Sequence, residues 1–141
     1  MTFIDSSGRK KTLKAVNKYL IDWRGKSLSK IQRAVKEFLE PYWKNCMVFE
    51  EFPLVGTRMK FDIYNATRRI ILEINGSQHS SFNPFFQKTR ANFLGQVKRD
   101  LEKADFCARN NIALVEITEK EFYGKTRQEL EEFFAEQGVI L

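Results

Sequence analysis

Two acidic residues, Asp62 and Glu73, stand in short apolar segments separated by a brief spacer. Residues 61–65 read FDIYN, and residues 70–79 read IILEINGSQH, which ends in the only histidine of the chain. In a strand, residues two apart share a face, so Glu73 and Asn75 point one way while the aliphatic residues enter a core. A buried charge is costly unless it is paired or binds a cation. We therefore interpret Asp62 and Glu73 as a metal site. The alternative is a surface aspartate and a glutamate paired with lysine or arginine.

The expected metal is Mg²⁺ or Mn²⁺, because these hard cations take oxygen ligands from carboxylates, carbonyls and water. Asp62 and Glu73 would supply two carboxylates from adjacent strands, and the carbonyl oxygen of Ile74 could add a third ligand. A cation held in this way neutralises phosphate charge and makes hydroxide available at neutral pH. Phosphodiester hydrolysis needs both effects.

Further polar residues are candidates for the same site. Asn75 could orient water or a phosphate oxygen, or could simply begin a turn. His79 could transfer a proton or ligate a metal, although a lone histidine is more often structural. Asp100 could ligate metal or orient His79, and Lys103 could neutralise phosphate; the two could equally form a helix salt bridge at i, i+3. Gln32 is a candidate for the edge of the site.

Length and composition indicate one folded intracellular domain. The chain has 141 residues, 43% of them hydrophobic, and 13 phenylalanines, which suits a proper core. No apolar run approaches the roughly 20 residues of a membrane span, and the N-terminus does not resemble a signal peptide. Cys46 and Cys107 are isolated, so we expect a reducing, cytoplasmic location and no membrane partner.

The net charge of +6 is unevenly distributed. Residues 1–30 hold eight lysines and arginines against two aspartates, whereas residues 111–141 hold seven glutamates. A basic arm of this kind suits nucleic acid; the alternative is a solvated helix face that keeps the protein soluble. The predicted phosphate contacts are Arg9, Lys10, Lys11, Arg68, Arg69, Lys88, Arg90 and Lys103.

Hydrophobic spacing predicts an α/β fold, an α+β mixed sheet with elements in the order α-α-β-β-β-α-β-α. The expected helices are 11–23, 27–42, 89–110 and 126–137, and the expected strands are 47–52, 58–64, 70–75 and 112–117. Short connections predict an antiparallel meander for the first three strands, and the long helix predicts a parallel crossover to the fourth. That helix should face the core through Phe93, Leu94, Val97, Leu101, Ala104 and Ala108, which leaves Phe106 unexplained on the opposite face.

The same residues carry a family resemblance. At Asp62, Glu73-Ile74-Asn75-Gly76 and His79, followed by Arg99-Asp100 and Lys103, the sequence resembles the PD-(D/E)XK nuclease superfamily, in the branch of very-short-patch repair (VSR-like) endonucleases and their homing-endonuclease relatives. The wider resemblance covers roughly residues 27–118 and implies a restriction-endonuclease-like core of about four strands flanked by helices. The implied division is a basic N-terminal helical arm, 1–26, and a single nuclease domain, 27–141.

Three positions depart from the family pattern. Phe61 stands where the superfamily has a proline, Asn75 stands in place of the signature lysine, and Gln32 replaces a helix glutamate that relatives often carry. In the homing-type branch a histidine and a later helix aspartate join the site, and His79 and Asp100 fit those roles.

The resemblance implies a metal-dependent endodeoxyribonuclease that uses Mg²⁺ or Mn²⁺ on double-stranded DNA. Nicking, or cutting of a mismatch, a branch or a specific site, is compatible with a single small domain, and a homodimer would be needed for a coordinated double-strand cut. By analogy such a protein suits a phage or mobile element. One alternative is a catalytically inactive nucleic-acid-binding module that keeps the fold. Another is a protein-interaction domain that uses the acidic C-terminal helix, which predicts no salt-sensitive DNA binding.

Overall fold

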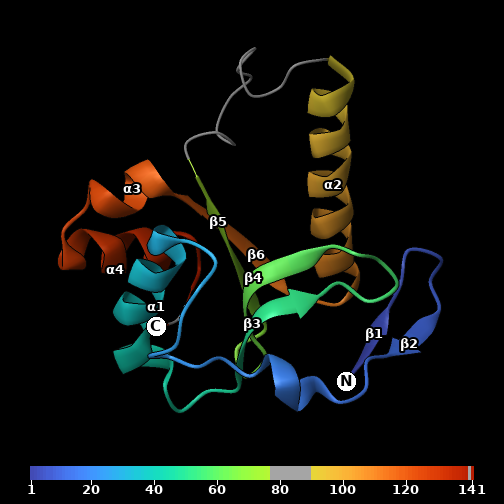
Figure 1. Ribbon diagram of the computed structural model, residues 1–141, viewed down its shortest axis with the longest axis horizontal. Helices are drawn as coiled ribbons and strands as arrows, with labels where there is room; N and C mark the ends of the chain where they lie inside the picture. The colour runs from blue at the N-terminus through green and yellow to red at the C-terminus, as the bar shows by residue number, and fades with distance from the viewer. Residues whose placement is uncertain (77–89, 140) are drawn as a thin grey trace.

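The computed structural model describes residues 1–76, 90–139 and 141. A four-stranded sheet in the order β3-β4-β5-β6 forms its centre (Figure 1). The elements are β1 (Thr2–Ile4), β2 (Lys10–Thr12), the 3₁₀ helix η1 (Val16–Tyr19), α1 (Lys30–Trp43), β3 (Val48–Pro53), β4 (Lys60–Asn65), β5 (Ile70–Asn75), α2 (Arg90–Arg109), β6 (Ala113–Thr118), α3 (Glu119–Tyr123) and α4 (Arg127–Glu136).

The topology of the central sheet confirms the sequence prediction. Strands β3, β4 and β5 form an antiparallel meander. The crossover through α2 then brings β6 parallel to β5, in a register that sets Glu73 beside Glu116. The mixed α/β class and the central four strands are therefore as expected.

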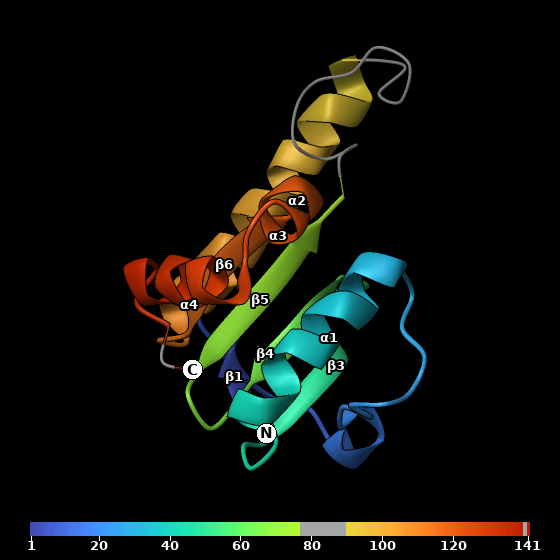
Figure 2. The ribbon, with the colours of Figure 1, turned by 90° about the vertical axis from the view of Figure 1, so that its left-hand side faces the viewer.

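Each face of the sheet has its own apolar core, and Figures 1 and 2 show the layers that cover them. On one face α1 and α4 pack on Ile63, Leu72 and Ile117, and Phe38 stacks on Phe134. The other face is covered by the β1–β2 hairpin and the C-terminal end of α2. Its core is largely aromatic: Phe3, Phe49, Phe52, Phe61, Tyr64 and Phe106.

The helix predicted over residues 11–23 is wrong, and with it the helical character of the arm. Residues 2–12 form the β1–β2 hairpin, which turns through Gly8 at φ +78°. Ala15 then takes the left-handed conformation at φ 55°, and only the single turn η1 follows. A left-handed residue cannot continue a right-handed helix, so the helical spacing of apolar residues here has another cause. Leu13 and Val16 pack from this irregular segment against the aromatic core.

Contacts across the chain hold the hairpin in place. Phe3 is buried against Phe52 and Phe106, with ring centroids 5.9 Å and 5.4 Å away. The Asn110 side chain accepts a hydrogen bond from the N–H of Ile4 at 2.7 Å and donates to its carbonyl at 3.0 Å. The hairpin thus shares a core with the sheet, while the predicted division at residues 26 and 27 stays a prediction.

The orientation predicted for α2 is also wrong. Leu94, Val97 and Leu101, which were expected to pack on the sheet, are exposed. Phe106 and Cys107 are buried instead, in the aromatic core. The helix therefore packs on the sheet through its C-terminal end and turns its most regular apolar face outward.

The remaining helices begin where the sequence provides caps. Ser29 accepts from the N–H of Gln32 at the start of α1. Thr118 and Thr126 form capping boxes with Glu121 and Glu129 at α3 and α4. The short α3 was not predicted. Within the described residues, no helix has the length and apolar character needed to cross a membrane.

Candidate functional site

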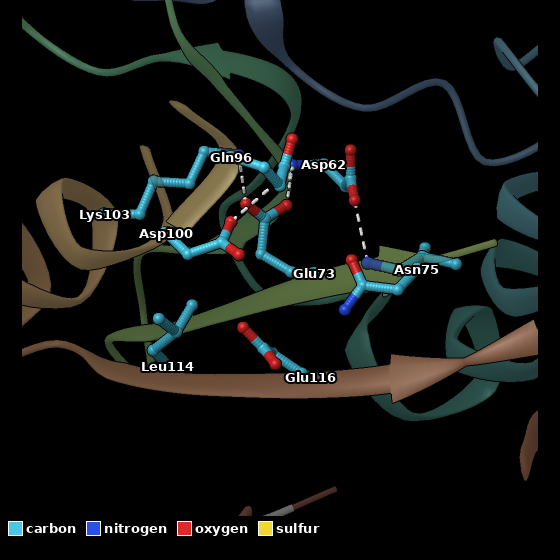
Figure 3. A pocket seen from close by; sticks show the side chains of 9 residues that line it. Asp62, Glu73, Asn75, Gln96, Asp100, Lys103, Leu114 and Glu116 are labelled. Atoms are coloured by element: carbon cyan, nitrogen blue, oxygen red, sulfur yellow. Dashed lines mark hydrogen bonds and ion pairs between the residues drawn. The ribbon is translucent and has the colours of Figure 1, made fainter. Parts of the chain in front are cut away.

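The candidate site lies where β4 and β5 part. Regular pairing of these strands ends at Ile63 opposite Leu72. At the next position the N–H of Asp62 donates to Glu73 Oε2 at 3.1 Å, and the N–H of Ile74 donates to Asp62 Oδ2 at 2.7 Å (Figure 3). Two carboxylates thus accept the hydrogen bonds that backbone carbonyls would accept in a regular pair of strands.

The surroundings of Asp62 raise the pKa of its carboxyl group. Burial, followed by the negative charge of Glu73, raises the pKa of Asp62 to about 8. Glu51, on the neighbouring strand β3, adds to this rise. Since charged carboxylates in contact repel each other at low dielectric, Asp62 is mostly protonated at neutral pH. A cation between the two groups would reverse that preference.

Lys103 provides the positive charge on the α2 side. Its ammonium group forms an ion pair with Glu73 Oε1 and lies 5.6 Å from the centre of the Phe61 ring. Glu73 is buried and Lys103 is mostly buried. The predicted phosphate-binding lysine is therefore committed to a site carboxylate.

These groups line a pocket of about 200 Å³ between β5, β6 and α2. Six residues that the sequence proposed are in it: Asp62, Glu73, Ile74, Asn75, Asp100 and Lys103. Gln96 donates to Asp100 Oδ1 at 3.0 Å and so orients that carboxylate (Figure 3). The pocket thus collects carboxylates from β4, β5 and α2.

Glu116 and Leu114 complete the pocket from β6 and were not predicted as site residues. Glu116 is exposed, yet partial desolvation in the pocket and the charges of Asp100 and Glu73 raise its pKa. Glu116 could have been found from the predicted parallel pairing of β5 with β6, because that pairing, in the observed register, places Glu116 beside Glu73. Gln96 also lines the pocket and was not predicted as a site residue.

The donor set suits a hard divalent cation. Asp62, Glu73, Asp100 and Glu116 offer carboxylate oxygens, the ligands that Mg²⁺ and Mn²⁺ prefer. A cation bound beside Glu73 would favour ionisation of Asp62 and so complete this donor set. Within residues 1–76 and 90–139, however, no three histidine, cysteine or acidic side chains are close enough together to hold a metal ion. Asp62 and Glu73 are the pair around which a site would have to assemble.

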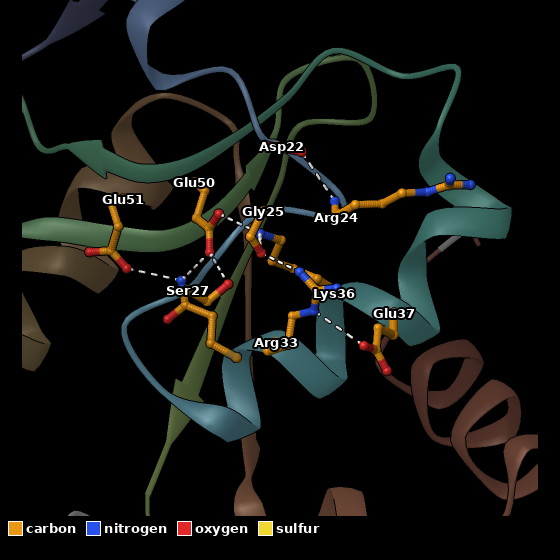
Figure 4. A network of polar contacts seen from close by, with 10 residues as sticks. Asp22, Arg24, Gly25, Ser27, Arg33, Lys36, Glu37, Glu50 and Glu51 are labelled. Atoms are coloured by element: carbon orange, nitrogen blue, oxygen red, sulfur yellow. Dashed lines mark hydrogen bonds and ion pairs between the residues drawn. The ribbon is translucent and has the colours of Figure 1, made fainter.

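Gln32 lies outside the pocket and takes part in a separate polar network. Figure 4 labels Ser27, Lys36, Glu50 and Glu51 of this network. Its side-chain amide donates to Glu50 Oε2 at 2.7 Å and to Glu51 Oε1 at 3.0 Å. Glu50 also pairs at 2.8 Å with the fully buried ammonium of Lys36 and accepts from the hydroxyl of Ser27. Gln32 therefore holds two β3 glutamates in place.

A backbone irregularity brings both glutamates to the α1 side of the sheet. Glu51 has φ +52°, so strict alternation of the side chains along β3 fails there. Both carboxylates then accept hydrogen bonds from the same Gln32 amide. Gln32 contacts the site only through Glu51, whose charge acts on Asp62.

Comparison with known proteins gives relatives but no family. No protein-family model and no solved structure matches the chain. Protein 033L of Invertebrate iridescent virus 3, described as uncharacterized, is 32% identical over 80 residues, which are 57% of this chain and 41% of the relative. Protein 307L of Invertebrate iridescent virus 6, also described as uncharacterized, is 36% identical over 59 residues, 42% of this chain and 30% of the relative. The chain thus spans less than half the length of these curated relatives.

The predicted phosphate contacts are scattered. Arg68 and Arg69 lie in the β4–β5 turn, at the opposite end of β5 from Asn75, and Arg69 donates to backbone carbonyls of Asn110 and Asn111 beyond the end of α2. This placement favours a structural role for Arg69.

The basic residues of the N-terminal hairpin are exposed, and the structure does not bring them to the pocket. Lys11 forms an ion pair with Asp5 at 3.5 Å, while Arg9 lies in the turn and Lys10 in β2. His79 and Lys88 fall outside the described residues. Arg90 begins α2, but its side chain is likewise outside them.

Proposed function

We propose that the chain is a divalent-metal-dependent endonuclease that hydrolyses DNA phosphodiester bonds, with Asp62 and Glu73 as metal ligands. The supporting observation is the contact of these two carboxylates in a pocket, where burial and mutual repulsion raise the pKa of Asp62 to about 8. Lys103 pairs with Glu73, whereas no ion pair in the described part of the chain compensates Asp62. A desolvated acid lowers stability unless it is compensated. The resemblance to PD-(D/E)XK nucleases gives the pair a function.

Five of the pocket residues have a defined part in this proposal. When bound, Mg²⁺ or Mn²⁺ would neutralise phosphate charge and supply hydroxide at neutral pH. Asp62 gives up its proton and presents a carboxylate that the N–H of Ile74 orients. Glu73 is fixed by Lys103 and by the N–H of Asp62. Asn75 faces the same pocket and can donate its amide to a phosphate oxygen.

Cleavage assays test the proposal. Supercoiled, linear, mismatched and branched DNA are incubated with Mg²⁺ or Mn²⁺, and wild type is compared with Glu73→Ala. Glu136→Ala, which removes an exposed carboxylate of α4, is the matched control. We expect metal-dependent cutting that Glu73→Ala abolishes and Glu136→Ala leaves intact. Cutting that persists in Glu73→Ala would place the active site elsewhere.

A second candidate is a DNA-binding module without catalytic activity. Lys103 already neutralises Glu73, as a metal would, and Asn75 lacks the charge of the signature lysine. A structure of crystals soaked in Mn²⁺ separates the two functions: an ion between Asp62 and Glu73 supports the nuclease, and a retained Lys103–Glu73 pair without an ion supports the binding module.

A further inference from the structure

The outward face of α2 carries an apolar stripe that no side chain in the described part of the chain covers. Leu94, Val97 and Leu101 are 53%, 38% and 65% exposed, and Ala104 and Ala108 are exposed beside them. Seven large hydrophobic side chains are exposed among the described residues, and three of them lie on this one face. Apolar residues gathered in this way mark an interaction surface, whereas single ones do not.

The spacing of the stripe is that of a coiled-coil seam. Residues 94, 97, 101, 104 and 108 follow each other at alternating steps of three and four, the a and d positions of a heptad. At 100° per residue this seam points away from Phe106, through which the helix packs into the aromatic core. Figures 1 and 2 show the N-terminal half of α2 extending beyond the sheet. A second helix can reach the seam.

Large and small side chains are distributed along the seam so that it can pack against the α2 helix of a second copy running antiparallel to it. The large residues, Leu94 and Val97, lie in its N-terminal half, and the small ones, Ala104 and Ala108, lie in its C-terminal half. Two identical antiparallel helices place large side chains against small ones around a central Leu101. A parallel pair sets large against large and leaves a gap between the alanines.

Charge along the flanks gives the same orientation. Lys98 and Asp105 border one edge of the seam, both exposed. In an antiparallel pair, Lys98 of each copy meets Asp105 of the other, which gives two opposite-charge contacts. A parallel pair instead brings Asp100 of each copy to Asp105 of the other, which gives two repulsive contacts, whereas the antiparallel pair sets only the two Asp100 side chains near each other.

We propose that two copies of this chain associate through antiparallel packing of α2 on α2. Such a contact is isologous and closes on itself as a twofold dimer. Asp100, which lines the pocket, flanks the other edge of the seam, so the second copy comes close to the pocket at this residue. The proposal stands independently of the nuclease assignment, because its test measures mass and not activity.

Analytical ultracentrifugation over a wide concentration range tests the dimer. Wild type should show a monomer–dimer equilibrium, and Leu101→Glu should raise the dissociation constant at least about tenfold. Leu28→Glu is the matched control, since Leu28 is 81% exposed in the segment before α1. Circular dichroism verifies that each variant is folded. A wild type that is monomeric throughout, or a dimer indifferent to Leu101→Glu, overturns the proposal.

A charge-swap experiment tests the orientation. Lys98→Glu alone sets a new carboxylate against Asp105 of the second copy, and Asp105→Lys alone sets a new ammonium group against Lys98, so each variant should dimerise weakly. Mixed in equal amounts, the two variants regain opposite-charge contacts and should form a heterodimer. If mixing restores nothing, the antiparallel arrangement is wrong.

Discussion

The N–H of Asp62 donates to the carboxylate of Glu73 at 3.1 Å, one position beyond the last regular pair of β4 and β5. The sheet therefore opens at the point where the half-buried Asp62 meets the buried Glu73. The backbone N–H groups of Asp62 and Ile74 donate to side-chain carboxylates of the neighbouring strand and not to its backbone carbonyls. These hydrogen bonds orient both carboxyl groups before any ligand arrives, so a cation would meet preplaced oxygen atoms and would need only to displace the proton of Asp62.

The metal-free protein should lose stability as pH rises from about 4 to about 8. The pKa of Asp62 is about 8 in the folded state and about 4 when unfolded, so between these values the folded state binds the extra proton. The dependence is at most about 1.4 kcal/mol per pH unit for one proton. Urea unfolding in EDTA from pH 5 to pH 8 measures it. In Asp62→Asn the decline should become shallower, with Glu116, whose pKa is also raised, still contributing; a decline of equal slope in that variant would assign it to another group.

Binding of Mg²⁺ or Mn²⁺ at pH 7 should release about one proton, because Asp62 must ionise to act as a ligand. Calorimetric titrations in two buffers with different ionisation enthalpies measure the release. Asp62→Asn should bind more weakly and release no proton. A binding enthalpy that is the same in both buffers for wild type would mean that Asp62 does not ionise on binding.

Lys103→Met should destabilise the metal-free protein by about 1–3 kcal/mol, because it leaves the buried Glu73 carboxylate without its cation. Chemical denaturation measures the loss. Arg24→Met is the control, since the Arg24–Glu40 pair is largely exposed at Arg24 and should cost less than about 1 kcal/mol. Mg²⁺ should recover more stability in Lys103→Met than in wild type; equal recovery would argue against a cation at Glu73.

The success of the prediction differed between segments for physical reasons. Residues 70–75 form β5 as expected, because an apolar run between turn residues has few other ways to bury itself. The helix expected over 11–23 failed because Leu13 and Val16 pack against aromatic residues far along the chain, and local spacing carries no information on those partners. For α2, periodicity identified a real apolar face but not which face meets the sheet.

The site was predicted in part for similar reasons. Asp62, Glu73 and Asp100 share one pocket, as predicted from the alternation of side chains along the strands and from the resemblance for Asp100. Gln32 contacts Glu50 and Glu51 because a positive φ at Glu51 reverses the direction of a side chain, which no pattern in the sequence reveals.

Lys36→Met should cost about 3–5 kcal/mol, since Lys36 is fully buried and pairs with Glu50. The double variant Lys36→Met/Glu50→Gln should be more stable than the single one, because it removes the stranded charge. Denaturation of both variants checks this order. A double variant that is less stable than Lys36→Met would show that packing, and not charge, determines the loss.

Asn110→Ala should loosen the N-terminal hairpin. The Asn110 side chain bonds both backbone groups of Ile4 and also donates to the carbonyl of Phe106 at 2.9 Å, so it joins β1 to the end of α2. Its loss leaves the N–H and carbonyl of Ile4 and the carbonyl of Phe106 without this hydrogen-bond partner, at a cost of about 1–3 kcal/mol. Amide hydrogen exchange should then quicken at Ile4 but not in β5, while Asn45→Ala, at an exposed position, should change neither. Unchanged exchange at Ile4 would mean that the contacts of Phe3 alone suffice to hold the hairpin.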